Sequence, residues 1–173
     1  MHHKRFFTLL LALNLMLGAC THSSQTAPGK VPLTAIHSGR QMVAVSKTLG
    51  GMWITNEDQL AALIDQAAWG TMIPAKPIAL PEIDFAASGV LVVWMGEMPS
   101  GGYALELMAE AAKVENRTAL VPLRWIEPEK GLLTTQIITH PYLMVRMGKG
   151  NYDTITVIDP NGLIKILVDV HGK

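Results

Sequence analysis

A glycine-rich stretch at residues 96–103, GEMPSGGY, follows the most apolar run of the folded part of the chain, SGVLVVWM. Such a stretch can cradle a phosphate, present a nucleophile or reverse the chain. A phosphate loop needs a lysine after its last glycine, where this chain has Tyr103. A nucleophile elbow needs a glycine two residues before its serine, and Met98 occupies that position before Ser100. The glycine spacing also differs from the GxGxxG dinucleotide motif, so we predict a chain reversal.

Other residues with catalytic or metal-binding chemistry are scattered along the sequence. Beyond the N-terminal apolar segment, the histidines are His22, His37, His140 and His171. No two of them have the spacing of a metal-binding pair, and no HExxH motif occurs. Glu127 and Glu129 lie in a polar EPEKG segment, where solvation is expected. We therefore expect no catalytic residue, metal or cofactor, and a hydrolase that uses Ser100 or His140 is the least favoured alternative.

The first twenty residues have the layout of a bacterial lipoprotein signal. Lys4 and Arg5 precede an apolar stretch shorter than the roughly 20 residues needed to span a bilayer, and small residues follow. The segment LGAC, which ends at Cys20, resembles a lipobox. The resemblance implies that residues 1–19 are a signal peptide and that Cys20 receives the acyl chains. Thr21, where aspartate would favour inner-membrane retention, implies an outer-membrane lipoprotein that faces the periplasm.

Cysteine count and charge exclude further classes of protein. Cys20 is the only cysteine, so an intramolecular disulfide is impossible. Loss of Lys4 and Arg5 with the signal peptide leaves 12 basic against 14 acidic residues, a net charge near −2. Nucleic acid is bound largely through phosphate contacts, so this chain has no electrostatic reason to bind it. Membrane lipid, reached through the acyl chains on Cys20, is the expected non-protein partner; the alternative is a plain secreted protein.

The N-terminal part is predicted to contain a tether, a strand and one helix. Residues 20–34 are rich in Ser, Thr, Pro and Gly, which predicts a flexible tether after the lipidated cysteine. Residues 35–87 are expected to belong to the same domain as the rest. Within them, residues 41–48 alternate as a strand does. Residues 56–68 have the apolar spacing of a helix, with Thr55 as its N-cap.

The C-terminal part, residues 88–173, is predicted to consist mostly of strands. The apolar run before the glycine-rich stretch has the length and composition of a strand buried on both faces. Pro122 within a strand at 117–126 indicates an edge strand or a bulge. Residues 154–158 and 163–170 flank the turn sequence DPNG, which predicts a hairpin.

Three motifs in order resemble the C-terminal domain of the PrcB family, accessory lipoproteins of bacterial protease complexes. A Gly-x-x-x-Ser-Gly-Gly-Tyr turn follows the apolar strand, TTQ occurs at residues 134–136, and a Pro-Tyr-x-x-Val pattern runs from Pro141 to Val145. The resemblance extends from about Ser88 to the C-terminus. It implies a β-sandwich-like module that associates with and stabilises a protease, and it brings no catalytic residues with it.

The local pattern and the resemblance disagree over residues 103–113, YALELMAEAAK. Its apolar residues fit a helical face and a strand face equally, and its high helix propensity slightly favours a helix. The resemblance implies a strand over residues 102–109, and we follow the resemblance.

We therefore expect a mainly β (α+β) domain, small and β-sandwich-like, with one helix near residues 56–68. The leading hypothesis is a non-enzymatic, membrane-anchored module that binds an envelope or surface protein such as a protease. The candidate partner-binding loop comprises Pro99, Ser100, Gly101, Gly102 and Tyr103. The structural alternative is a hairpin turn with a packed tyrosine. The functional alternative is a protease inhibitor that uses this loop, by analogy with chagasin-type inhibitors.

Overall fold

The computed structural model describes residues 29–41, 47–69, 79–131 and 133–172. These residues form one helix, α1 Glu57–Trp69, and nine strands. The strands are β1 Gly29–Gly39, β2 Gly50–Ile54, β3 Ser88–Trp94, β4 Ala104–Leu107, β5 Ala111–Glu115, β6 Thr118–Ile126, β7 Tyr142–Gly148, β8 Thr154–Ile158 and β9 Ile164–Asp169. The prediction of a mainly β domain with one helix is confirmed. The predicted signal peptide and Cys20 lie outside the described residues.

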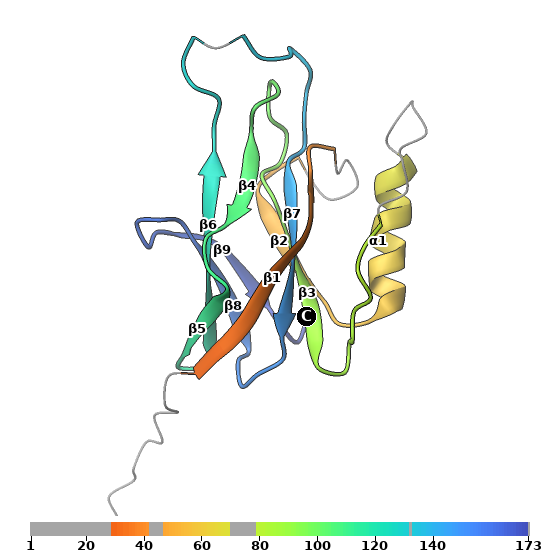
Figure 1. Cartoon of the computed structure of the whole chain (residues 1–173), viewed down its shortest axis with the longest axis vertical. Coiled ribbons are helices and arrows are strands. Elements are labelled where there is room, and N and C mark those ends of the chain that lie inside the picture. Colours follow the sequence, from red (N-terminus) through yellow and green to blue (C-terminus); the bar gives the residue numbers. More distant parts are fainter. Residues whose placement is uncertain (1–28, 42–46, 70–78, 132, 173) are drawn as a thin grey trace, which may run out of the picture.

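The strands form one sheet that bends until it nearly closes (Figure 1). The order of hydrogen-bonded neighbours is β2-β3-β7-β1-β5-β6-β8-β9, and β4 pairs with β6. The sheet has two halves, β2-β3-β7 on one side of β1 and β5-β6-β8-β9 with β4 on the other, and β1 pairs with both. Its residues 29–32 pair with β5 and its residues 33–39 pair with β7, with a register shift between Ala35 and His37. The chain therefore passes from one half of the sheet to the other within a single strand.

The two ends of the strand order, β2 and β9, meet by packing of side chains. A Cβ atom added to Gly51 of β2 would lie 3.1 Å from Val168 and 3.3 Å from Ile166, both of β9. The inner faces of the two halves share one buried cluster, which includes Leu33 and Leu123. The two halves thus enclose a single core, as the predicted sandwich would, but they do so within one continuous sheet.

Strand β3 is buried on both faces, as its continuous apolar sequence predicts. Leu91 and Val93 face the core between the two halves of the sheet. Val90, Val92 and Trp94 belong to a second cluster on the outer side. That cluster includes buried leucines of the helix α1, which covers this face of the sheet (Figure 1).

The helix lies within one residue of the predicted bounds, but its cap differs from the prediction. Asn56 Oδ1 accepts a hydrogen bond from the backbone N–H of Gln59 at 2.9 Å, which makes Asn56 the N-cap. Thr55 instead donates its backbone N–H to Gln59 Oε1 at 3.0 Å. The Gln59 side chain thus bonds the residue before the N-cap, and a capping box would instead use the N–H of the N-cap itself. The acidic Glu57 and Asp58 lie in the first turn, where the helix dipole favours them.

The predicted flexible tether extends too far into the chain. Residues 29–34 lie in β1, where Val31 and Leu33 are buried and hydrogen-bonded strands flank them. The segment KVPL looked like a linker because of Pro32, yet Pro32 is the last residue paired with β5 before β1 turns to β7. Most of the strand predicted at 41–48 lies outside the described residues, and its last two residues are not in a strand.

Pro122 does not mark an edge, because β6 has hydrogen-bonded neighbours on both sides. On one side β5 pairs with β6 up to Leu120, and β4 pairs with it from Leu123 onward. Pro122 lies in the gap between these two partners, and its carbonyl accepts the backbone N–H of Met108 at 3.1 Å. A residue without an N–H is therefore tolerated inside the sheet at this position.

Two other predictions for the C-terminal part are confirmed. Strands β4 and β5 occupy the segment for which helix and strand competed, so the expectation of a strand was correct. Strands β8 and β9 pair antiparallel around the DPNG turn. There Asp159 Oδ1 accepts the backbone N–H groups of Asn161 and Leu163, each at 2.9 Å, and Gly162 has a φ of +80°.

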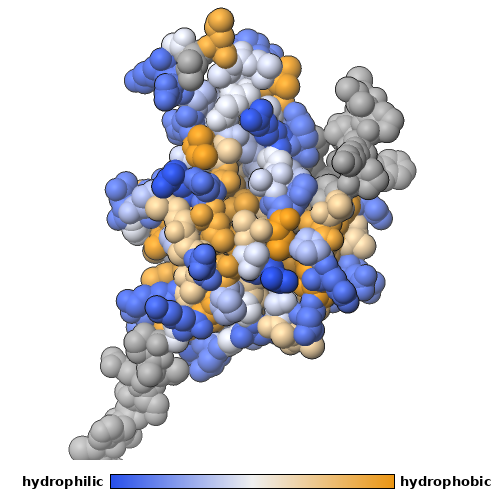
Figure 2. Space-filling view, viewed as in Figure 1, coloured by the Kyte–Doolittle hydropathy of each residue, from blue (hydrophilic) through white to orange (hydrophobic). Residues whose placement is uncertain are grey.

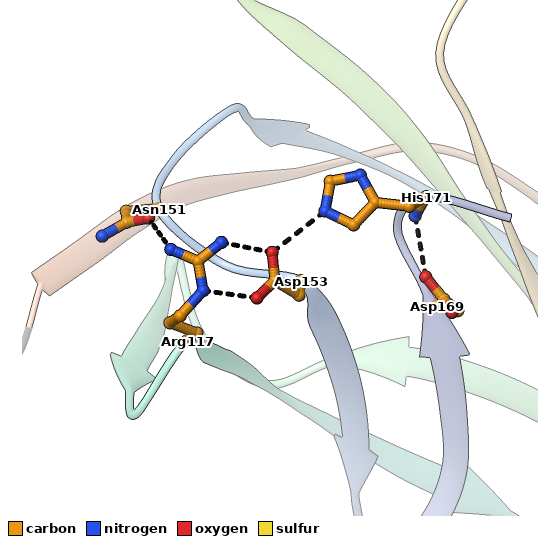
Figure 3. Close-up of polar contacts among 5 residues, drawn as sticks. All are labelled: Arg117, Asn151, Asp153, Asp169 and His171. Atoms are coloured by element: carbon orange, nitrogen blue, oxygen red, sulfur yellow. Dashed lines mark hydrogen bonds and ion pairs between the residues drawn. The ribbon is translucent and has the colours of Figure 1, made fainter.

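A polar network joins three segments at one end of the sheet, which we call the base end (Figure 3). Arg117, in the β5–β6 turn, donates two hydrogen bonds to the carboxylate of Asp153 and one to Asn151. His171, after β9, contacts the same carboxylate at 2.9 Å through Nε2. The Arg117 hydrogen bond, and after it the His171 hydrogen bond, lowers the pKa of Asp153 from 3.8 to about 2.

This network predicts an acid-dependent contribution to stability. Because the pKa of Asp153 is lower in the folded chain, its stabilising contribution is complete above about pH 4 and is lost as the pH falls toward 2. Asp153→Asn removes the titrating group, so the variant should lose less stability between pH 5 and pH 2 than the wild type does. Urea unfolding across this pH range measures the difference, with Glu82→Gln as an exposed carboxylate control. Equal pH dependence in wild type and Asp153→Asn would contradict the assignment.

Candidate partner-binding surface

The glycine-rich stretch joins β3 to β4, but these two strands do not pair with each other. Strand β3 pairs with β2 and β7, whereas β4 pairs with β6 on the other half of the sheet. Residues 96–103 therefore form a crossover, and the prediction of a hairpin turn is wrong. Hairpins and crossovers need the same glycines to redirect the chain, so the local sequence does not distinguish them.

The crossover is hydrogen-bonded along its length to the long connection between β6 and β7. Met98 and Thr139 exchange backbone hydrogen bonds of 2.8 and 2.9 Å. Thr139 also donates its hydroxyl to the carbonyl of Ser100 at 2.9 Å. The next residue, Gly101, donates its N–H to the carbonyl of Thr135 at 2.9 Å. The SGGY and TTQ motifs, more than thirty residues apart in sequence, thus meet in space.

The close contact between these motifs requires both glycines. A Cβ atom on Gly101 would lie 2.4 Å from Thr135 Oγ1, far inside van der Waals contact. Gly102 has a φ of +96°, a conformation that favours glycine, and its added Cβ would lie 2.9 Å from Pro128. The glycines therefore leave room for the side chains of Thr135 and Pro128, and they also allow the reversal of the chain.

The predicted partner-binding loop is mostly covered by this packing. Ser100 and Gly101 are buried, and Gly102 is partly buried. Tyr103 packs against the core of the sheet, as the structural alternative expected of it. Of the five residues predicted to bind a partner, Pro99 alone is exposed. The loop as a whole is therefore not available to a partner.

Three exposed apolar side chains lie on the connection that covers the loop, and a second set, Leu163, Ile164 and Leu167, lies in or next to β9. Leu133 is fully exposed, and Ile137 and Ile138 are each more than half exposed. Figure 2 shows hydrophobic side chains among hydrophilic ones at this end of the molecule, beyond the ends of β4 and β6. We call the side chains of Pro99, Leu133, Ile137 and Ile138 the apical surface. Sequence analysis missed this surface, although aliphatic residues in an otherwise polar connection were a visible signal.

Ser100 and His140 are the polar residues near this surface that were considered for catalysis. The Ser100 hydroxyl is buried and lies 3.2 Å from the carbonyl of Gly101, to which it donates. His140 has a buried Nδ1 that lacks a hydrogen-bond partner among the described residues. Within those residues, no group of three or more His, Cys, Asp or Glu side chains could hold a metal ion. The exposed aliphatic side chains can therefore contribute binding by burial of apolar area, which is the chemistry of a protein contact.

No helix in the described part of the chain is long and apolar enough to cross a membrane.

The packing of Gly101 against Thr135 predicts a rescue experiment. Gly101→Ala should lower the free energy of unfolding by about 1–3 kcal/mol, because the new methyl group overlaps Thr135 Oγ1. Thr135→Ala removes that oxygen from an exposed residue and should alone change stability by less than about 0.5 kcal/mol. In the double variant most of the loss should be recovered. Additive effects in urea unfolding of the four proteins would show that the two residues do not pack as described.

Comparison with known proteins finds one family model that matches the region around the apical surface. Residues 90–148 match the family model described as PrcB C-terminal. The matched region runs from β3 through both motifs to the end of β7 and stops before the β8–β9 hairpin. No curated protein and no solved structure matches the chain. Residues 90–148, with the apical surface within them, are therefore similar to the PrcB C-terminal family.

Proposed function

We propose that this protein is a non-enzymatic accessory module that binds a protein partner through its apical surface. The observation that carries the proposal is the coincidence of two findings. The PrcB C-terminal match covers the crossover and the connection above it, and the same connection presents Leu133, Ile137 and Ile138 to solvent. A family of protease-complex subunits supports a protease as the partner.

The hydrogen bonds beneath the apical surface restrict the conformation of part of it, which favours binding of a partner. The segment that presents Ile137 and Ile138 is fixed at both ends, by Thr135 to Gly101 and by Thr139 to Met98 and Ser100. Fewer side-chain and backbone conformations are then lost when a partner binds. Each aliphatic side chain that becomes fully buried contributes about 1.5–3 kcal/mol. Ile137 and Ile138, which lie in the segment held in this way, can therefore contribute to a specific contact.

Burial of the glycine-rich loop weighs against the inhibitor alternative. An inhibitor of the chagasin type would insert residues 99–103 into a protease cleft, yet Ser100 and Gly101 are covered by the β6–β7 connection. An accessory subunit requires no such insertion. It requires only a stable surface on which the partner can pack.

We further propose that the module is anchored by lipid at Cys20 in the cell envelope, on the periplasmic side of the outer membrane. The sequence LGAC and the following Thr21 support this localisation. Acyl chains contribute about 0.8 kcal/mol per buried methylene, so two or more chains hold a protein stably at a membrane. The tether then comprises residues 21–28, because β1 begins at Gly29.

Lipidation predicts a processing defect in Cys20→Ser. Because the cysteine sulfur is the site of acylation that precedes cleavage, this variant should accumulate as unprocessed precursor. Pulse labelling followed by electrophoresis separates the precursor from the mature chain, and radiolabelled fatty acid should enter the wild type but not Cys20→Ser. Ser23→Ala, in the predicted tether, serves as the control and should be processed normally. Normal maturation of Cys20→Ser would rule out the lipid anchor.

Partner binding predicts a selective effect of charge at the apical surface. Tagged full-length protein is purified from solubilised envelopes, and the co-purified proteins are quantified by mass spectrometry. The double variant Leu133→Asp/Ile137→Asp should recover at least about 10-fold less partner, since loss of apolar burial exceeds 1.4 kcal/mol. The control Leu167→Asp changes an exposed leucine on β9, away from the apical surface, and should recover the partner normally.

Two outcomes of this experiment would contradict the proposal. Unchanged recovery by the double variant would exclude the apical surface, and no protein enriched above the untagged strain would exclude a stable partner. The activity of a co-purified protease separates the two functions. An accessory subunit leaves the protease active in the complex, whereas an inhibitor suppresses it.

A further inference from the structure

The apical surface and the start of the folded chain lie at opposite ends of the sheet (Figure 1). Strand β6 begins at the base end, directly after the turn that contains Arg117, and ends at Ile126, where the connection to the apical surface begins. Its nine residues span about 27 Å at 3.3–3.4 Å per residue. This length separates the base end from the apical end.

Strand β1 begins at the base end. Gly29 is paired with Val114 and Lys30 with Lys113, next to the β5–β6 turn at the base. Any segment that precedes Gly29 must therefore leave the domain from the base end. The polar network of Arg117, Asp153 and His171 lies at the same end, in contrast to the aliphatic side chains at the apical end.

From this geometry we propose that the apical surface faces away from the membrane that holds the lipid anchor and docks on the water-exposed part of a protein. The inference rests on the proposed lipidation of Cys20. Exposed leucine and isoleucine side chains can in principle insert into a bilayer or pack on a protein. The position of the lipid anchor distinguishes between contact with a bilayer and contact with a protein.

The length of the tether determines whether the apical surface can reach the bilayer that holds the anchor. Nine residue steps separate Cys20 from Gly29, so the fully extended segment reaches at most about 32 Å. A flexible coil of nine residues has an average end-to-end distance of about 15–18 Å. To bring the apical surface to the same bilayer, the tether would have to run nearly straight along the whole length of β6 and beyond it. Such extension removes most of its conformational freedom, and the base-down orientation requires none.

The orientation also restricts the partner. Its contact region must lie at least the length of the sheet, about 27 Å, beyond the base end. A protein embedded wholly within the bilayer cannot reach that height. The partner that fits is a water-soluble envelope protein or a domain that projects from the membrane, with an apolar recess that accepts aliphatic side chains.

The orientation can be measured without the partner. The full-length lipoprotein is reconstituted into phosphatidylethanolamine–phosphatidylglycerol vesicles after Leu133→Cys or Lys30→Cys, two exposed positions at opposite ends. Because Cys20 carries lipid, a thiol-reactive fluorophore labels only the new cysteine. A nitroxide quencher on the lipid headgroup should quench the label at position 30 several-fold more strongly than the label at position 133. Equal quenching at both positions, or stronger quenching at position 133, would overturn the proposal.

A second arm separates this inference from the proposed function. With a nitroxide on the acyl chain, quenching of the label at position 133 would show that the apical surface enters the bilayer and would overturn the inference. Photo-crosslinkers placed at Leu133 and Lys30 in intact envelopes then test the partner. A protein adduct is expected from position 133 and not from position 30. If the quenching is as expected but position 133 yields no adduct, the orientation stands, whereas the docking on a protein and the partner-binding function both fail.

Discussion

Strand β1 is hydrogen-bonded to both halves of the sheet, and the remaining architecture depends on this double pairing. Because the first residues of β1 pair with β5 and the rest pair with β7, the two halves meet at an angle across one core. Neither half is complete without β1, since β5 and β7 would each expose an unpaired edge in its absence. The fold is therefore expected to form as one cooperative unit.

The same double pairing determines where the functional surface lies. In the order of strands, β1 and β5 separate β7 from β6, so the connection from β6 to β7 must cross the end of the sheet. Such a long connection is not stable by itself, and the crossover from β3 to β4 supports it from below. Thr139, Ser100 and Gly101 provide that support through buried hydrogen bonds. The SGGY and TTQ motifs are thus the two sides of one contact.

Features that depend on local sequence could be predicted, and features that depend on distant partners could not. The apolar run of β3, the spacing within α1 and the DPNG turn each determine their own structure. The strand character of residues 29–34 depends on β5 and β7, so a segment rich in turn-forming residues was assigned to a tether. The burial of Ser100 likewise depends on Thr139, which lies 39 residues away. The lipid anchor stays a prediction, because Cys20 lies outside the described residues.

The positions of two prolines have a consequence for how the chain finds its register. Pro32 and Pro122 each lie where a strand exchanges one neighbour for the next, so neither interrupts a continuous ladder. If either strand slipped along its neighbour, the proline would face a carbonyl that needs a donor. An unsatisfied buried carbonyl costs about 1–3 kcal/mol, and a slip by one residue also turns the apolar side chains outward. The prolines thus discriminate against misaligned sheets while the chain folds, and the correct alignment is the one in which their missing donors cost nothing.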